Sequence, residues 1–499
     1  MTGGVCLHAD DPADEAGFRS DQAGVPLPYA LVRCAMSAAS THRKRALDEL
    51  ACVHPNAAGL DIGSEEIVVA VPLARDPQPI RAFQTFTTDL HALVAWLLAC
   101  GIDTVAMEST GVFWIPIYEL LEAAGITPYL VNARHVKTVP GRKTDWNDAQ
   151  WLQKLHAFGL LQGSFRPDAE IRTLRTLARY RSELVERRAP HINHMIQALK
   201  HMNIQLNLVL TDITGVSGLA MLRAIIAGER DPQRLAAFRQ PGCKHSEAEI
   251  IKALTGTWDD TQIFLLTQSV DLFDYYTTKL SACDAHLEQQ YQAMQSRGEP
   301  DAPLPDLPPA KGESNSKNAM SFNARAQLAR VIGVDLVAVM GLSAITVQTI
   351  ISEIGTDMER FPTVKHFCSW LGLAPHNDIS GGKVLRSRTM KVHSRANQAF
   401  RQAAHSVTRA HSSIGAYYRA MRARLGPKQA IVATAHKIAR IVYHLLKTGE
   451  PYREESDADY ERKRQEREIK HLARRAQKLG YTLTAVPATA PESPPEAGG

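Results

Sequence analysis

The chain has 499 residues and a hydrophobic content of 44%, enough for two or three domains with buried cores. Its 57 basic and 52 acidic residues leave a net charge of only +5, so any affinity for nucleic acid must come from local basic patches. No apolar run approaches the roughly 18 residues of a membrane span, no signal peptide is recognisable, and seven cysteines are scattered without a CxxC pair. This composition argues against a membrane or secreted protein and against a structural zinc site, and we expect a cytoplasmic location.

The first ordered region predicted along the chain is an α/β domain over residues 52–165, which follows a disordered extension over residues 1–51. In the segment 60–71, LDIGSEEIVVAV, a strand carries Asp61 near its end, and Gly63 permits a tight turn into a second strand. A third strand over 81–88, a helix over 89–100 and a strand ending near Glu108 follow. A helix over 115–125 and a strand over 127–133 complete the order β-β-β-α-β-α-β, which is the order expected of an RNase H-like sheet.

Four acidic residues of this domain suggest a metal site. Asp145 and Asp148 are three apart at the start of a predicted helix, which puts both carboxylates on one helical face. With Asp61 and Glu108 they form an oxygen-rich set of the kind that Mg²⁺ prefers, and two such ions about 3.5–4 Å apart can stabilise both oxygens of a phosphodiester exchange. Each acid alone is explained as readily by a turn or a helix cap. Their occurrence on successive elements of one predicted sheet favours the metal site.

Residues 166–298 read as long helices. The pattern over 171–189 is helical, is broken by Pro190 and resumes over 191–202, and a second helical run covers 259–295. Two long helices with apolar stripes need partners, which an antiparallel hairpin or a coiled coil between subunits would supply. Prolines and polar residues then mark a linker over 299–320.

A mostly helical domain is predicted for residues 321–450. Its segment 331–355 reads as two short helices around Gly341, either a helix-hairpin-helix that holds a DNA phosphate or a plain packing hairpin. Further on, Ser380 precedes two glycines, and glycines let a backbone approach a phosphate closely. By itself Ser-Gly-Gly is typical of a flexible turn, and a serine hydroxyl needs activation from elsewhere to act as a nucleophile.

Basic residues cluster in three places, over 134–143, 383–395 and 461–478. The second cluster contains no acid, so it is the strongest candidate for phosphate contact, whereas the third, in a predicted charged helix over 451–480, has interleaved glutamates that also fit a salt-bridged surface helix. The tail over 481–499 is predicted to be disordered. The candidate nucleic-acid contacts are Arg142, Lys143, Lys383, Arg386, Arg388 and Lys391.

Several segments together resemble a known family. The stretches GLDIGSEEIVVAV, AMESTGVFWIPIYELLEAAG, VNARHVKTVPGRKTDWNDAQWLQKL and FPTVKHFCSWLGLAPHNDISGGKVLRSR are similar, in sequence and order, to the insertion-sequence transposases of the IS110 family, which includes the Piv-type DNA invertases. The segment DITGVSGLAMLRAIIAGERDP resembles the IS-eleven-eleven subgroup within it. The likeness covers roughly residues 52 to 480.

The resemblance implies specific roles. A RuvC-like domain would supply the DEDD acids Asp61, Glu108, Asp145 and Asp148 as ligands of Mg²⁺, with two ions expected. A C-terminal transposase domain would supply Ser380 as the nucleophile of a covalent phosphoserine intermediate. It further implies a coiled coil between subunits, a dimer or tetramer with composite active sites, and a guide RNA encoded by the element that pairs with donor and target DNA. Association with the bacterial nucleoid would follow.

Three alternatives remain open from the sequence. A RuvC-type junction endonuclease would use the same acids with water as the nucleophile. An actin-like ATPase also opens on a strand with Asp-x-Gly, although no second Gly-rich phosphate loop is visible. A non-catalytic DNA-binding scaffold is less favoured because all five candidate residues are intact.

Overall fold

The computed structural model describes residues 51–108, 111–131, 145–161, 163–295, 305–307, 317–390, 392 and 394–484. It divides into two compact units, Met1–Arg166 and Pro167–Gly499. The predicted N-terminal extension up to residue 50, most of the predicted linker, and the candidate nucleic-acid contacts Arg142, Lys143 and Lys391 lie outside the described residues. Of the predicted tail, only residues 481–484 are described.

The first unit is built on a five-stranded sheet, which confirms the predicted α/β domain. The strands are β1 (Ala57–Ile62), β2 (Glu66–Ala70), β3 (Ile80–Gln84), β4 (Thr104–Glu108) and β5 (Thr127–Val131), in the spatial order β3-β2-β1-β4-β5. β1, β2 and β3 pair antiparallel, whereas β4 is parallel to β1 and β5 is parallel to β4. The turn between β1 and β2 is closed by a hydrogen bond from the Gly63 N–H to the Glu66 carbonyl, 2.9 Å long, as the predicted tight turn requires.

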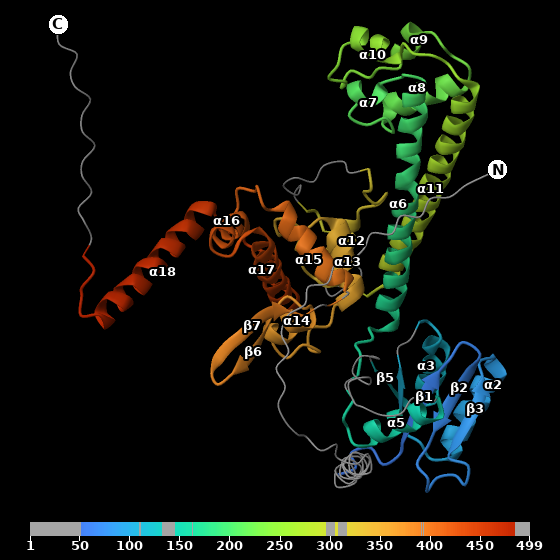
Figure 1. Ribbon diagram of the computed structural model, residues 1–499, viewed down its shortest axis with the longest axis vertical. Coiled ribbons are helices and arrows are strands. Elements are labelled where there is room, and N and C mark those ends of the chain that lie inside the picture. The colour runs from blue at the N-terminus through green and yellow to red at the C-terminus, as the bar shows by residue number, and fades with distance from the viewer. Residues whose placement is uncertain are drawn as a thin grey trace, which may run out of the picture. The chain divides into compact units, whose positions relative to one another are not determined.

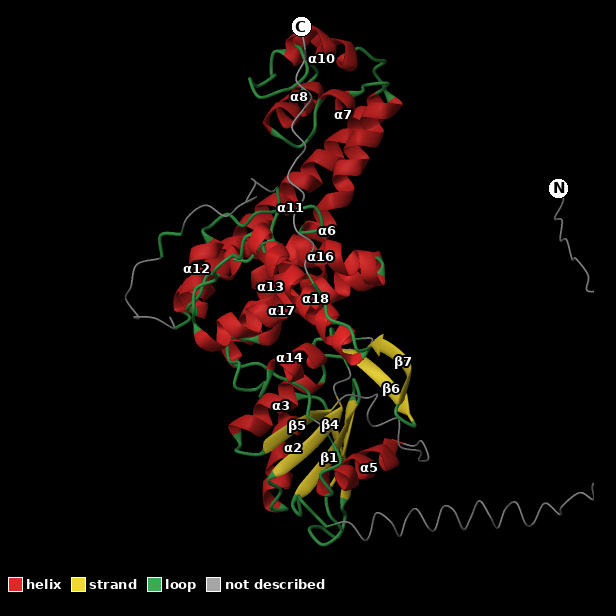
Figure 2. Cartoon of the chain, turned by 90° about the vertical axis from the view of Figure 1, so that its left-hand side faces the viewer, coloured by secondary structure: helices red, strands yellow, loops and turns green. Residues whose placement is uncertain are grey.

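Helices cover both faces of this sheet. Leu60 and Met107 point to the face covered by α2 (Thr87–Ala99) and α3 (Trp114–Ala123), where they share a buried cluster with both helices. Side chains alternate between the faces of a strand, so Ala106 points to the opposite face, where it packs on α5 (Asp145–Ala157). Figure 2 shows α5 alongside the strands.

The packing of α5 on β1 is unusually close because Gly59 has no side chain. A Cβ on Gly59 would lie 2.3 Å from the Ala149 carbonyl oxygen and 2.4 Å from the Gln153 nitrogen. At the far end of α5, the buried His156 ring hydrogen-bonds the Thr104 hydroxyl of β4 at 2.8 Å. Because β1 and β4 run parallel, these contacts fix α5 antiparallel to both strands.

The second unit is organised around two long helices, α6 (Ala169–His201) and α11 (Asp260–Ala293), which lie side by side (Figure 1). They are antiparallel, since Arg181 pairs with Asp284 and Arg188 with Thr277. The Arg181–Asp284 pair is buried, and removing one partner from such a pair typically costs about 3–5 kcal/mol. α6 and α11 thus form an antiparallel hairpin within one chain, which is the first of the two predicted arrangements.

The prediction that Pro190 breaks the first of these helices is wrong. Proline removes one helical hydrogen bond and crowds the preceding turn, yet α6 continues through it. Packing on α11 offsets this cost beside the proline, where Arg188 lies over the Phe273 ring and His191 stacks on Tyr276.

Each end of the helical pair has its own hydrophobic core. At one end the core gathers α7 (Leu206–Val209), α8 (Val216–Ile226), α9 (Pro232–Ala236) and α10 (Glu247–Leu254). At the other it gathers α12 (Ala324–Ile332), the short 3-10 helix η1 (Leu336–Ala338), α13 (Ala344–Ile354), α14 (Val364–Trp370), α15 (Arg395–Ser406), α16 (Ser413–Leu425) and α17 (Pro427–Thr448). α18 (Asp457–Lys478) follows α17 and packs on α16. None of the described helices is both long and apolar enough to cross a membrane.

The segment 331–355 differs from the predicted pair of helices. The first helix is reduced to the single 3-10 turn η1, because α12 ends at Gly333, and the second is the α-helix α13. Gly341 has a φ of 97°, and a Cβ there would lie 2.7 Å from the Ala403 carbonyl of α15. This turn is therefore a packing contact on α15.

We predict that Gly59→Ala destabilises the first unit by about 1–3 kcal/mol, because the added methyl group forces α5 away from β1. Chemical denaturation of the full chain would measure this change. Gly242→Ala is the control, since a Cβ on Gly242 meets no atom within 4 Å. Equal stability of both variants would contradict the close contact.

We also predict that acid weakens the attachment of α5. Burial lowers the pKa of His156 from 6.5 to about 4, so below pH 6.5 the unfolded chain takes up a proton at this residue that the folded chain does not. This contribution to stability is present above about pH 6.5 and is lost as the pH falls towards 4. Thermal unfolding of wild type and His156→Gln across this range tests it, and the advantage of wild type should shrink with falling pH. A constant difference would contradict it.

Candidate active site

Asp61 and Glu108 lie at the same level of two neighbouring strands. The parallel ladder pairs Gly59 with Ala106 and Leu60 with Met107, so the next position along sets Asp61 beside Glu108. Asp61 is on the same face as Gly59, and Glu108 is on the same face as Ala106, because side chains alternate along a strand. Both carboxylates therefore point to the sheet face covered by α5, at the carboxyl ends of β1 and β4.

The start of α5 reaches this same edge of the sheet. Gln153 donates to the Ala57 carbonyl at 3.2 Å near the beginning of β1, whereas Ala149, one turn earlier in α5, lies against Gly59. The first turn of α5 therefore extends towards Asp61. Asp148 is in this turn and is exposed, and Asp145 is its first helical residue. The side chain of Asp145 lies outside the described part of the chain.

The donor set at this edge fits a divalent cation. Asp61 and Glu108 offer hard carboxylate oxygens from rigid strands, and Asp148 adds a third from the facing helix, which are ligands that Mg²⁺ takes in proteins. Among the described side chains, however, no three His, Cys, Asp or Glu come close enough together to form a metal-binding group. Asp61 and Glu108 thus lie on one face of the sheet at the same level. Asp145 and Asp148 are added to this set only because the first turn of α5 extends towards that edge of the sheet.

Ser380 lies in the second unit, at the tip of an exposed β-hairpin that protrudes beside α14 (Figure 1). The hairpin consists of β6 (Pro375–Ser380) and β7 (Lys383–Thr389), joined by Gly381 and Gly382 with φ of 54° and 76°. Two successive residues with positive φ form the tight turn that suits a two-residue hairpin. The predicted turn at Ser380 is thus present, but the two strands around it were not predicted.

One face of this hairpin collects the polar groups around Ser380. The ladder pairs Ser380 with Lys383, Asp378 with Arg386, and His376 with Arg388. Paired residues share a face, and these three pairs alternate with Ile379–Val384 and Asn377–Ser387, so all six lie on the face of Ser380. A β-bulge at Leu385 makes this possible, because Lys383 and Arg386 are three residues apart and would point to opposite faces of a regular strand.

Three of the predicted nucleic-acid contacts, Lys383, Arg386 and Arg388, therefore lie on the same exposed face of the hairpin as Ser380. Sequence reasoning missed His376 and Asp378, whose side chains lie 3.6 Å apart from Nδ1 to Oδ1. The period-two spacing of His, Asp and Ser at 376, 378 and 380 would have indicated them, if the segment had been recognised as a strand.

Comparison with known proteins gives two family matches. A model described as a transposase matches residues 58–204, which include the sheet acids, and a model of the IS116/IS110/IS902 transposase family matches residues 335–419, which include the hairpin. No curated protein matches the chain.

We predict that Asp61→Asn and Glu108→Gln each weaken Mn²⁺ binding by about tenfold or more, equivalent to about 1.4 kcal/mol, because each removes an anionic ligand. Isothermal titration of the full chain measures it. Asp103→Asn is the matched control, since Asp103 is exposed and precedes the opposite end of β4. Equal Mn²⁺ affinity in all three variants would exclude this edge as a metal site.

Proposed function

The chain belongs to the IS110 family of transposases, and from this premise we propose that it cuts and rejoins DNA strands through a covalent bond to Ser380. The family makes it a DNA-processing enzyme and implies DNA binding and the use of a divalent metal. The observation that carries the proposal is the common face and level of Asp61 and Glu108 beside the start of α5. This arrangement offers acids for phosphodiester chemistry, while Ser380 and its cationic neighbours offer a nucleophile and phosphate contacts.

The strand order supports assigning the first unit to the RNase H-like, or RuvC-like, fold. Three antiparallel strands followed by two parallel ones, in the order β3-β2-β1-β4-β5, are what that assignment requires. We assign Asp61, Glu108, Asp145 and Asp148 as ligands of Mg²⁺, most simply of two ions. When bound, the metal would polarise the phosphate and stabilise the charge on the departing oxygen.

The proposed exchange conserves phosphate ester bonds. The Ser380 Oγ attacks the phosphorus, one P–O bond to the DNA sugar breaks, and the hydroxyl proton is transferred to the departing sugar oxygen. The phosphoserine so formed is attacked by the hydroxyl of another DNA end, which restores the serine and joins the strands. Lys383, Arg386 and Arg388 hold the phosphate by charge, since all three lie on the face of Ser380.

We propose that working sites are composite. The acids are in the first unit and Ser380 is in the second, and the hairpin exposes both of its faces. A dimer or tetramer in which the acids of one protomer meet Ser380 of another would complete the site, with the α6–α11 region contributing to assembly through a coiled coil. A guide RNA from the element would then select donor and target DNA by base pairing.

We predict that Ser380→Ala abolishes a covalent protein–DNA adduct. The full chain would be incubated with Mg²⁺, labelled element-end and target DNA and RNA from the flanking noncoding region, and resolved on a denaturing gel. Ser387→Ala is the matched control, because Ser387 is exposed on the same hairpin and points to its other face.

A labelled adduct in wild type and Ser387→Ala, and its loss in Ser380→Ala, would support the serine mechanism. Cleavage without an adduct that persists in Ser380→Ala would support the hydrolytic junction endonuclease instead. We further expect Asp61→Ala, Glu108→Ala and Asp148→Ala to lose cleavage while retaining DNA binding.

A further inference from the structure

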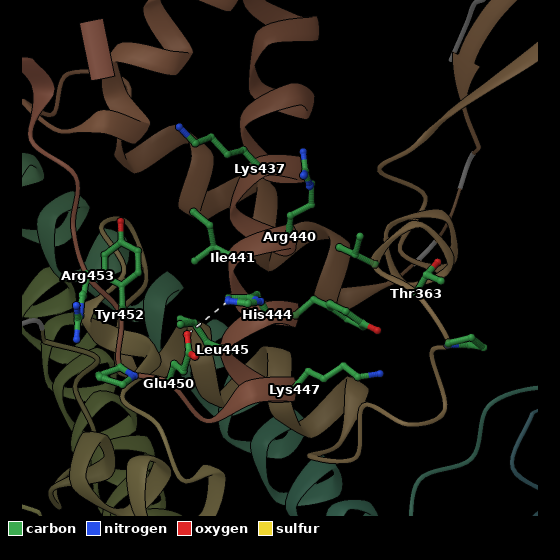
Figure 3. A pocket seen from close by; sticks show the side chains of 14 residues that line it. Thr363, Lys437, Arg440, Ile441, His444, Leu445, Lys447, Glu450, Tyr452 and Arg453 are labelled. Carbon is green, nitrogen blue, oxygen red and sulfur yellow. Dashed lines mark ion pairs between the residues drawn. The ribbon is translucent and has the colours of Figure 1, made fainter. Parts of the chain in front are cut away.

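A groove of about 1100 Å³ follows the C-terminal half of α17 in the second unit (Figure 3). Its walls are α17, the start of α14 near Thr363, and the segment over 450–453 that leaves α17. It lies outside the hairpin that carries Ser380, and no candidate residue of the proposed reaction lines it. The groove is therefore a separate feature of the unit.

Basic side chains form one stripe along this groove. Lys437, Arg440, His444 and Lys447 recur every three or four residues, which places them on one side of α17. The ten steps from Lys437 to Lys447 span about 15 Å at 1.5 Å per residue. Arg453 adds a further cation from the following segment, and Figure 3 shows these side chains around the groove.

These basic side chains differ in whether other groups of the protein already contact their charge. Lys437 lies 4.4 Å from the Tyr460 ring centroid and 4.8 Å from that of Tyr417, so its charge is covered by aromatic rings. Its pKa is lowered to about 8, chiefly by burial. Arg440 and Arg453, by contrast, are exposed and have no salt-bridge partner among the residues that the structure describes.

Besides Glu455, which acts by its charge on Lys437, two acids pair with the stripe, and both pairs are exposed. Glu450 lies 3.8 Å from the His444 Nε2, and Glu359, whose side chain is 83% exposed, lies 3.7 Å from the Lys447 Nζ. Exposed ion pairs of this kind contribute only about 0–1 kcal/mol. An incoming anion with several charges can therefore replace them.

The sequence around the groove is strongly basic. No Asp or Glu occurs between Asp378 and Glu450, although the whole chain is almost balanced with 57 basic and 52 acidic residues. The positive charge of the protein is thus concentrated in the part of the second unit to which α17 belongs. A basic surface of this kind attracts phosphate backbones at long range.

We propose that this groove binds the phosphodiester backbone of a nucleic-acid strand, an inference that rests on the proposed function because it gives the recombinase a second contact with its nucleic acids. Successive phosphates of one strand advance about 3.4 Å along the axis of a duplex, so a stripe of about 15 Å spans several of them. Arg440 and Lys447 supply the charge, and the Tyr452 ring and Ile441 line the groove as apolar surface for the sugars and bases. The backbone chemistry is common to DNA and RNA.

The test is a salt titration of binding. The full chain carrying Arg440→Gln and Lys447→Gln would be compared with wild type by fluorescence anisotropy, using labelled duplex DNA, single-stranded DNA and flanking-region RNA at several KCl concentrations. Each lost phosphate contact reduces the slope of log K against log salt by about 0.7–0.9, so the double variant should lose about 1.4–1.8. Its affinity for the ligand that occupies the groove should fall about tenfold or more, and the ligand that responds identifies DNA or RNA as the source.

Two controls separate this site from general surface charge. Arg424→Gln with Lys428→Gln removes the same charge from exposed positions outside the groove. Arg440→Lys with Lys447→Arg keeps the charge and should restore the affinity and the slope. Thermal unfolding of each variant verifies that the fold is retained.

The groove proposal is overturned if the variant with Arg440→Gln and Lys447→Gln has the same affinity and salt slope as the variant with Arg424→Gln and Lys428→Gln for all three ligands. In that case the recombinase proposal stands or falls on the Ser380 adduct, which is measured independently. Failure of wild type to bind any of the three ligands would overturn both proposals.

Discussion

The candidate active site depends on one contact, the approach of α5 to β1 at Gly59. Backbone atoms of Ala149 and Gln153 occupy the space that a side chain would need. Because the two elements touch there, the first turn of α5 extends to the edge of the sheet where Asp61 and Glu108 end their strands. A wider gap between helix and strand would leave the sheet acids without a facing helix. The absence of one methyl group thus sets the distance on which the acid set depends.

Much of the first unit follows from its sequence because each element has a strong local signal. Apolar runs define β1 and β4, and Asp61 and Glu108 are predicted near the ends of these strands. That the two acids share a level follows from the parallel pairing of Leu60 with Met107, which no pattern within either strand fixes. No local pattern, however, indicates that Gly59 is the contact point of α5, since that depends on a helix nearly a hundred residues away.

The second unit shows where local reasoning fails. At Pro190 the backbone preference is overruled by packing on α11, which no pattern within α6 reveals. The strands around Ser380 were missed because every residue of β6 is exposed and the strand has no apolar alternation to detect. The glycines after Ser380 were recognised, but their role as a hairpin turn appears only with the strand pairing.

The bulge at Leu385 has a consequence for how this hairpin tolerates change. A side chain in β7 can be exchanged for another of similar size without moving its neighbours, since the strand is exposed along almost its whole length. An added residue is different, because a shift of one position turns every side chain beyond it to the other face of the strand. Deleting Leu385 would only remove the bulge, since Lys383 and Arg386 would then be two residues apart and would stay on the face of Ser380. Inserting one residue between Lys383 and Arg386 without a second bulge would carry Arg386 and Arg388 to the other face, so this strand is predicted to tolerate exchange of a side chain, or loss of Leu385, better than an insertion.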